Sequence, residues 1–159
     1  MLEIIATLAP PRGRSPDRIT AEPVRPAAFV ASRPSARIVR RAVQRNLERL
    51  GYHVIAAGDG EEATRIAGTL DGIDLLLSDV VMPGIDGPEL ACRLRAKWRD
   101  LPVLFVTGYS ADRLSRSGAV GPHDRVLEKP YQFDELARTI RGMLESQVER
   151  RAVDPPPAA

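Results

Sequence analysis

The chain of 159 residues has the length of one domain, because domains contain roughly 100 to 200 residues. Apolar residues make up 43% and charged residues 28%, which is ordinary for a globular protein and excludes disorder throughout the chain. No run approaches the roughly 18 apolar residues of a membrane span, and the start lacks the basic lead of a signal peptide. A cytoplasmic protein with no membrane association is expected.

Positive charge is concentrated at the start of the chain. Residues 1–51 hold ten Arg and four acidic residues, for a net charge of +6, whereas residues 52–159 hold thirteen basic and seventeen acidic residues, for −4. A nucleic-acid site would combine clustered basic residues with aromatic side chains, and the chain has only seven aromatic residues. No nucleic-acid partner is therefore expected. The single cysteine, Cys92, excludes an internal disulfide and is expected to be buried.

Proline marks the two ends of the folded part. Six of the fourteen prolines lie in residues 1–34 and three more in residues 155–157. Segments of this kind are typical of poorly ordered tails. The sequence predicts a disordered Pro- and Arg-rich segment over residues 1–26, a folded domain over 27–149 and a disordered tail over 150–159.

Short apolar runs without polar alternation predict strands that are buried on both faces. These runs are Ala28–Ala31, His53–Ala57, Leu75–Leu77, Val103–Val106 and Val126–Leu127. Between them, apolar residues recur every three and four positions in segments that each predict an amphipathic helix. These segments are 38–50, 63–70, 90–98 and 133–148, and a weaker one at 110–121 predicts a short helix.

Residues at the ends of these segments support the same reading. Asp86, Gly87 and Pro88 are typical of a helix start, and Gly51 is typical of a helix end. Strands that alternate with helices predict an α/β fold, namely a doubly wound five-stranded parallel sheet of flavodoxin-like order 2-1-3-4-5. In such a fold the working site lies beyond the carboxyl ends of the strands.

Three chemically different side chains follow successive predicted strands. Asp79 follows the third strand, Thr107 the fourth and Lys129 the fifth. Each residue alone is ordinary at a strand end or turn. Because parallel strands end at the same edge of a sheet, however, we expect the carboxylate, the hydroxyl and the ammonium to converge.

The segment from Arg40 to Leu144 resembles the receiver domain of bacterial two-component response regulators. The resemblance rests on the run Asp-Val-Val-Met-Pro-Gly-Ile-Asp-Gly at residues 79–87, on the spacing of 22 residues between Thr107 and Lys129, and on Lys129-Pro130. The stretch Pro102–Ser110, with its Phe-Val-Thr-Gly-Tyr run, further resembles the receivers of hybrid sensor kinases and some stand-alone receivers.

This resemblance implies phosphorelay signal transduction. Asp79 would accept a phosphoryl group from the phosphohistidine of a sensor histidine kinase or phosphotransfer protein. Thr107 and Lys129 would bind its oxygens through charge-assisted contacts. By the same resemblance, Mg²⁺ would be held by Asp79 and the backbone carbonyl of Val81, and Tyr109 would be part of the phosphoryl-binding switch.

The aromatic residue that turns inward on activation in most receivers is replaced here by Val126. Tyr109, which lies two residues after Thr107, is the candidate to take over its role. Tyr131 is expected to serve in packing.

The acidic pair that holds Mg²⁺ after the first strand of receivers is absent. A gapless count back from Gly51 places the pair at Pro34 and Ser35, and alignment of the first strand places it at Ser32 and Arg33. Neither alternative supplies a carboxylate. Since Mg²⁺ in proteins is usually held by one or two carboxylates plus phosphate oxygens, Asp79 alone is expected to bind it weakly.

Three interpretations remain open. In the first, the protein is a slow receiver in which Arg33 supplies positive charge at the position of the metal. In the second, it is a degenerate receiver that acts as a phosphorylation-independent protein-interaction module. In the third, the first forty residues are not the native reading frame, because the resemblance is close only from Arg40 onward.

Enzyme classes fit the sequence less well. A hydrolase of the haloacid dehalogenase type needs a second Asp two residues after its nucleophile, and that position is Val81. The histidines His53 and His123 lack the spacing of metal ligands. We expect a phosphoacceptor with at most slow self-phosphorylation and dephosphorylation, rather than an enzyme. Too few residues follow Val148 to fold alone, so the signal is expected to leave through protein contacts, as in stand-alone receivers, or through a lost partner domain. A monomer or weak homodimer is expected.

Overall fold

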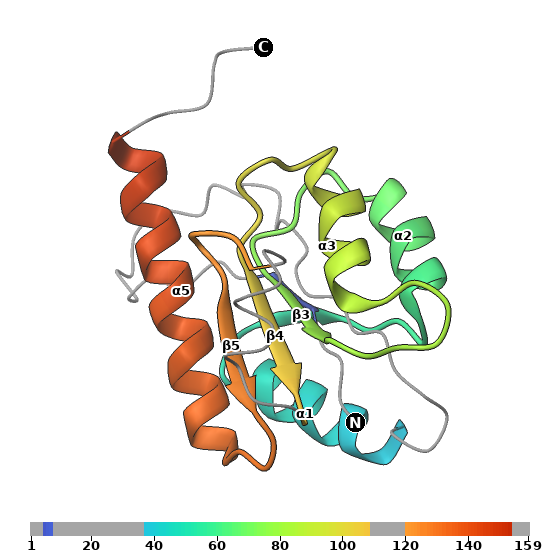
Figure 1. Ribbon diagram of the computed structural model, residues 1–159. Helices are drawn as coiled ribbons and strands as arrows, with labels where there is room; N and C mark the ends of the chain where they lie inside the picture. The colour runs from blue at the N-terminus through green and yellow to red at the C-terminus, as the bar shows by residue number, and fades with distance from the viewer. Residues whose placement is uncertain (1–4, 8–36, 109–119, 154–159) are drawn as a thin grey trace, which may run out of the picture.

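The computed structural model describes residues 5–7, 37–108 and 120–153 (Figure 1). In chain order the elements are β1 (Ile5–Thr7), α1 (Arg37–Arg49), β2 (His53–Ile55), α2 (Gly60–Gly68), β3 (Leu76–Asp79), α3 (Gly87–Arg95), β4 (Val103–Thr107), β5 (Arg125–Glu128) and α5 (Phe133–Val153).

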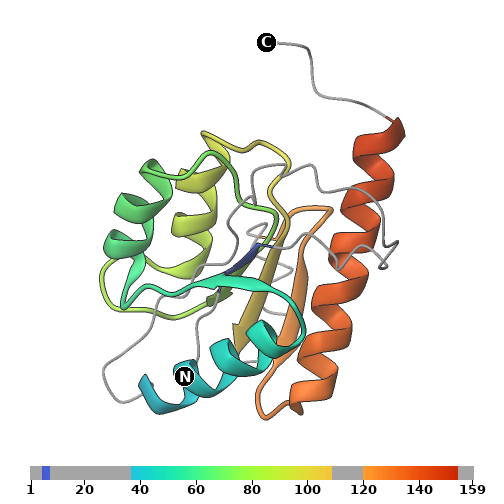
Figure 2. The same ribbon diagram turned by 180° about the vertical axis from the view of Figure 1, so that it is seen from behind.

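The helices cover both sides of the strands. α1 and α5 lie on one side, and α2 and α3 lie on the other (Figures 1 and 2). β3, β4 and β5 form a parallel sheet in that order. Every residue of β3 and β4 is buried, which explains why these strands are continuous apolar runs in the sequence. The third to fifth predicted strands are thereby confirmed as parallel neighbours.

The first two strands are arranged differently from the prediction. β1 and β2 form an antiparallel pair, in which Ile5 pairs with Ile55 and Thr7 pairs with His53. β1 also contacts β3, so it lies between β2 and the parallel strands. Across the part of the chain that the structure describes, three strands are parallel and two form a separate antiparallel pair, and the predicted five-strand order is not confirmed.

β1 lies within the segment 1–26, for which the sequence analysis predicts disorder. The prediction of disorder rests on the prolines of the whole segment. The short run around β1 contains the β-branched residues Ile5 and Thr7, which favour extended backbone. The strand predicted at Ala28–Ala31 lies outside the described residues, as do residues 110–119 of the weak helical segment.

The four strongly predicted helices are confirmed. The side chain of Asp86 caps α3 by accepting a hydrogen bond from the backbone N–H of Glu89 at 2.8 Å, and a proline follows in the first turn. Gly51 follows α1 with a φ of 90°, a conformation that favours glycine. α5 continues to Val153, beyond the predicted domain end at residue 149.

Three apolar side chains are exposed against expectation. The prediction that Cys92 is buried is wrong, because the residue lies on the outer face of α3, two positions after the buried Leu90. Leu50 is 38% exposed in the turn after α1, and Val148 is 54% exposed on α5. On α5 the inward position is taken by the neighbouring Gln147, which continues the buried stripe of the helix.

A buried carboxylate joins the segments at the edge where β4 and β5 begin. Asp124, whose side chain is fully buried, accepts hydrogen bonds from the backbone N–H groups of Val103 at 2.9 Å and Gly121 at 2.6 Å. It also forms an ion pair with Arg95, which donates a further hydrogen bond to the carbonyl of Leu101 at 2.9 Å. One side chain therefore ties the end of α3, the start of β4 and the turn before β5 together.

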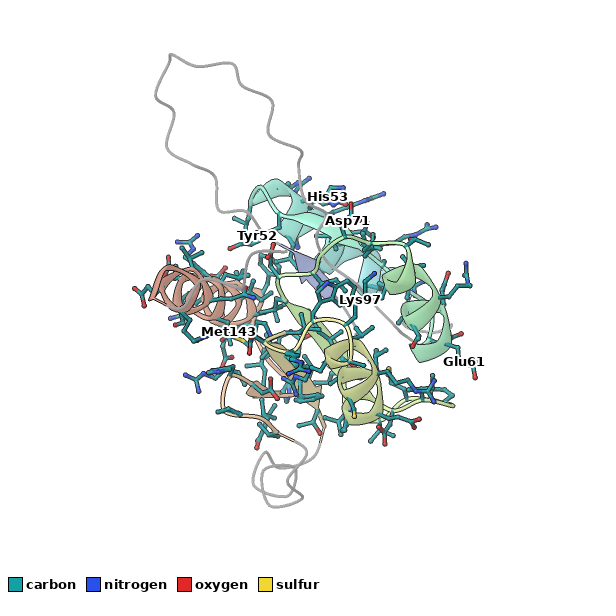
Figure 3. The ribbon with its side chains drawn as sticks, turned by 90° about the horizontal axis from the view of Figure 1, so that it is seen from above. Tyr52, His53, Glu61, Asp71, Lys97 and Met143 are labelled. Atoms are coloured by element: carbon teal, nitrogen blue, oxygen red, sulfur yellow. The ribbon has the colours of Figure 1, made fainter. Side chains whose placement is uncertain are left out.

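Lys97 holds the end of α2 against α3. Its side chain is labelled in Figure 3. The ammonium donates hydrogen bonds to the carbonyls of Leu70 at 2.7 Å and Gly68 at 3.3 Å, and lies 4.8 Å from the ring centre of Trp98. A cation at a helix carboxyl end is stabilising, and so is a cation over an indole ring.

None of the described helices combines the length and apolar character needed to cross a bilayer.

We expect the substitution Asp124→Asn to lower the free energy of unfolding by about 2 to 4 kcal/mol, because it removes the partner of a partly buried Arg95 and disturbs two buried backbone donors. The measurement is urea denaturation. The matched control is Glu89→Gln, which breaks the exposed pair with Arg93 and should change stability by no more than about 0.5 kcal/mol. Equal effects of the two substitutions would contradict the structural role of Asp124.

Candidate functional site

A lysine and an aspartate that are 50 residues apart in sequence form an ion pair at the carboxyl edge of the sheet. Asp79 is the last residue of β3 and is only 2% exposed. The Nζ of Lys129, the first residue after β5, donates a hydrogen bond to Oδ1 of Asp79. A buried carboxylate needs such a partner, since removing one member of a buried pair costs about 3 to 5 kcal/mol. The sequence prediction that these two groups meet is confirmed.

Thr107 lies at the same edge. It is the last residue of β4, the strand between β3 and β5, and it is buried. The backbone N–H of Lys129 donates to the carbonyl of Thr107 at 2.8 Å, while that of Val80 donates to the carbonyl of Val106 at 3.0 Å. The hydrogen-bond ladder thus continues one residue beyond the strands. It fixes the backbones of all three predicted site residues relative to one another.

The start of α3 packs directly on the backbone of Asp79. A Cβ added at Gly87 would overlap the carbonyl oxygen of Asp79, so only glycine fits there. The same oxygen accepts a hydrogen bond from the Ser78 hydroxyl at 2.9 Å. The backbone N–H of Gly87 donates to the carbonyl of Val80 at 3.1 Å. These contacts hold the strand end that carries the carboxylate in one position.

The remaining predicted residues are only partly accounted for. Val81 is 51% exposed on the loop after β3. Tyr109 and Arg33 lie outside the described residues, as do Ser32, Pro34 and Ser35, so their predicted roles stay predictions.

The donor set of this edge does not by itself make a magnesium site. Within residues 37–108 and 120–153 and the short β1, no three His, Cys, Asp or Glu side chains lie close enough to hold a metal ion. Asp79 is engaged by Lys129, and Val81 would add one backbone oxygen. Mg²⁺ prefers a near-octahedral set of oxygen donors, which these two residues do not provide.

Tyr131 is a residue that the sequence analysis assigns to packing alone. It is half-buried and packs against the core, as predicted. In addition, burial and then the negative charge of Asp79 raise the pKa of the Tyr131 hydroxyl above its ordinary value.

Comparison with protein families gives one match over most of the chain. The model described as "Response regulator receiver domain" matches residues 36–141. The chain is 40% identical over 110 residues to the sensor kinase CckA of Brucella abortus, and 36% identical over 106 residues to the response regulator receiver protein CpdR of the same species. These matches cover 69% and 67% of this chain, and 12% of CckA and 88% of CpdR. The response regulator MprA of Mycobacterium leprae is 37% identical over 68% of this chain and 47% of its own length.

Solved structures give the same result. The receiver domain of the hybrid histidine kinase CckA superposes with a TM-score of 0.58 at 38% identity, over 73% of this chain and 95% of that domain. The chemotaxis protein CheY4 of Vibrio cholerae superposes with a TM-score of 0.63 at 29% identity, over 73% of this chain and 98% of its own. Both similarities extend over nearly the whole of the compared structures.

We expect Gly87→Ala to destabilise the protein by about 1 to 3 kcal/mol, because the added methyl group would push the backbone of Asp79. Gly142→Ala on α5 is the matched control, since a Cβ there meets no atom within 4 Å. This control should stabilise the protein by about 0.5 to 1 kcal/mol. Thermal unfolding of the two variants measures both effects, and a stabilising Gly87→Ala would contradict the close packing.

Proposed function

The chain belongs to the response regulator receiver family of two-component signalling, and on that premise we propose that it accepts a phosphoryl group on Asp79. The observation that carries this proposal is the ion pair between Lys129 and Asp79 at the strand ends, with Thr107 bonded to Lys129 through the backbone. A carboxylate paired with a cation, with the residue Thr107 at the end of the neighbouring strand, suits a reaction in which negative charge develops on phosphoryl oxygens.

The proposed transfer breaks one bond to phosphorus and forms another. An oxygen of the Asp79 carboxylate attacks the phosphorus of a phosphohistidine on the partner. The P–N bond breaks as the P–O bond forms, and the electron pair leaves with the imidazole, which takes up a proton from solvent. The product is an acyl phosphate. The Lys129 ammonium then pairs with a phosphoryl oxygen instead of the carboxylate, and the Thr107 hydroxyl donates to another.

The partner is proposed to be a sensor histidine kinase or a phosphotransfer protein. The chain spans 12% of the sensor kinase CckA and about half of MprA, so the activities of those whole proteins are not transferred to it. We propose that the chain is a monomer or weak homodimer in solution.

It is a phosphoacceptor rather than an enzyme, with at most slow self-phosphorylation and dephosphorylation, because Val81 stands where a hydrolase would need a general acid.

Mg²⁺ is proposed to bind this receiver weakly. Receivers generally bind the ion at the phosphorylation site through an acidic pair, and both alignments of this sequence lack that pair.

We predict that acetyl phosphate with Mg²⁺ adds one phosphoryl group to the wild type, detected by intact mass, and none to Asp79→Asn. Asp71→Asn is the control, because Asp71 is exposed and lies on the α2–β3 connection, away from the strand ends of the site. An adduct that persists in Asp79→Asn would contradict the assignment of the acceptor. A folded wild type that forms no adduct but still binds a kinase would support the phosphorylation-independent interaction module instead.

Restoring a carboxylate should tighten metal binding. We expect either Arg33→Asp or Ser35→Asp to raise the affinity for Mg²⁺, measured by calorimetric titration, because each places an acid at one of the two positions that the alternative alignments give to the missing pair. The variant that responds identifies the correct alignment. If neither substitution changes the affinity, the weak binding has a cause other than the missing pair.

A further inference from the structure

Ser78 is a polar residue inside a strand that is otherwise apolar until its last residue. It belongs to β3, directly before Asp79, and none of its surface is exposed to solvent. Burial of a hydroxyl costs free energy unless the group forms a hydrogen bond. The Oγ of Ser78 donates such a bond to the backbone carbonyl of Asp79 at 2.9 Å and lies 3.9 Å from the Sδ of Met82. Because a thioether sulfur is a weak acceptor, the carbonyl is the main partner of the hydroxyl proton.

Both polar groups of the peptide unit between Asp79 and Val80 are hydrogen-bonded. Its carbonyl accepts from Ser78, and its N–H, which belongs to Val80, donates to the carbonyl of Val106 at the end of β4 at 3.0 Å. A peptide unit is planar, so bonds on both sides fix its orientation. That orientation sets the ψ angle of Asp79, and with it the direction of the carboxylate relative to the neighbouring strand ends.

We propose that Ser78 is a positioning residue for phosphoryl transfer, whose hydroxyl holds the backbone of Asp79 so that the carboxylate keeps the orientation needed to attack phosphorus. This inference rests on the proposed function, because it requires transfer to Asp79. Ser78 acts through Asp79 and makes no contact with the phosphoryl group itself.

Close packing around the carbonyl of Asp79 makes the hydroxyl difficult to replace. A Cβ added at Gly87, at the start of α3, would overlap this carbonyl oxygen and would lie 3.0 Å from the Oγ of Ser78. An apolar side chain in place of the serine would deprive a buried carbonyl of this donor, which is costly. The peptide unit would then turn toward another donor, and the side chain of Asp79 would turn with it.

A small rotation of the carboxylate matters because the transfer depends on geometry. The attacking oxygen has to lie roughly in line with the bond to phosphorus that breaks. In enzymes, a misplacement of about 1 Å can slow a reaction by about a hundredfold. The backbone of Lys129 is fixed separately, by its hydrogen bond to the carbonyl of Thr107. A rotated carboxylate would therefore lose its alignment with the ammonium as well.

The first measurement is the rate of adduct formation with acetyl phosphate, followed by intact mass. Ser78→Ala removes the hydroxyl without adding atoms. Ser78→Val and Ser78→Thr introduce the same branched shape, and only threonine keeps a hydroxyl. We expect Ser78→Ala and Ser78→Val to slow adduct formation by about three- to tenfold, which corresponds to the loss of one ordinary hydrogen bond, and Ser78→Thr to stay within about twofold of the wild type.

Ser146→Ala is the matched control for these variants. The Ser146 hydroxyl also donates to a backbone carbonyl at 2.9 Å, that of Gly142, but it does so on the exposed surface of α5. This substitution should leave the rate unchanged. Thermal unfolding checks that each variant folds.

The second measurement separates positioning from a purely structural role. The protein is labelled with aspartate that carries ¹³C in its side-chain carboxyl group, and the resonance of Asp79 is the one missing in Asp79→Asn. We expect this resonance to move in Ser78→Ala and to keep its wild-type position in Ser146→Ala. A serine that only stabilises the fold would lower the unfolding temperature without moving the resonance.

Three results would overturn the inference while the proposed function stands: Ser78→Ala with the wild-type rate, equal rates for folded Ser78→Thr and Ser78→Val, or a slow Ser78→Ala with an unmoved Asp79 resonance. If the two larger side chains prevent folding, the rate and the resonance of Ser78→Ala decide. A wild type that forms no adduct at all would remove both the inference and the proposed function.

Discussion

The ion pair between Lys129 and Asp79 is the interaction on which the arrangement of the site depends. It connects the ends of β5 and β3 across β4, so it closes only if all three strands run parallel and end at the same level. The register meets this condition, since Asp79 pairs with Val106 and Thr107 pairs with Glu128. The ammonium in turn makes the burial of a carboxylate tolerable, because an uncompensated charge inside the protein is strongly destabilising. Fold and site thus depend on each other.

The sheet carries a second buried carboxylate at its opposite edge, and the two are stabilised differently. Asp124 is held by two backbone N–H groups and by Arg95, whose planar guanidinium has a fixed geometry. Asp79 is paired with a lysine, a single charge on a flexible stem that can follow an acceptor as it moves. The first arrangement suits a permanent joint between segments, and the second suits a group that exchanges one anionic partner for another.

The environment of Asp79 is built mainly from the protein's own donors. Lys129 and Thr107 come from the two neighbouring strand ends, and Gly87 holds the backbone of Asp79 by close packing. Tyr131 lies on the loop that begins with the lysine and packs against the core. In the proposed phosphoryl transfer, the ammonium of Lys129 and the hydroxyl of Thr107 would be the groups that contact phosphoryl oxygens directly.

Much of this protein follows from local sequence pattern. The four confirmed helices and the strands β2 to β5 show periodicities that hold over a few residues. Asp79, Thr107 and Lys129 were predicted to meet because the ends of parallel strands share an edge. Local pattern also has limits: Cys92 was expected to be buried from the habit of its residue type, which says nothing about the helix face on which it lies.

Only the tertiary structure decided the contacts between distant segments. The pairing of β1 with β2 and the joint between Arg95 and Asp124 over 29 residues have no local signature. Each of these contacts forms only because the folded chain brings together segments that are far apart in the sequence. Periodicity reports which face of an element is apolar, whereas the partner of a polar group is chosen by packing of the whole domain.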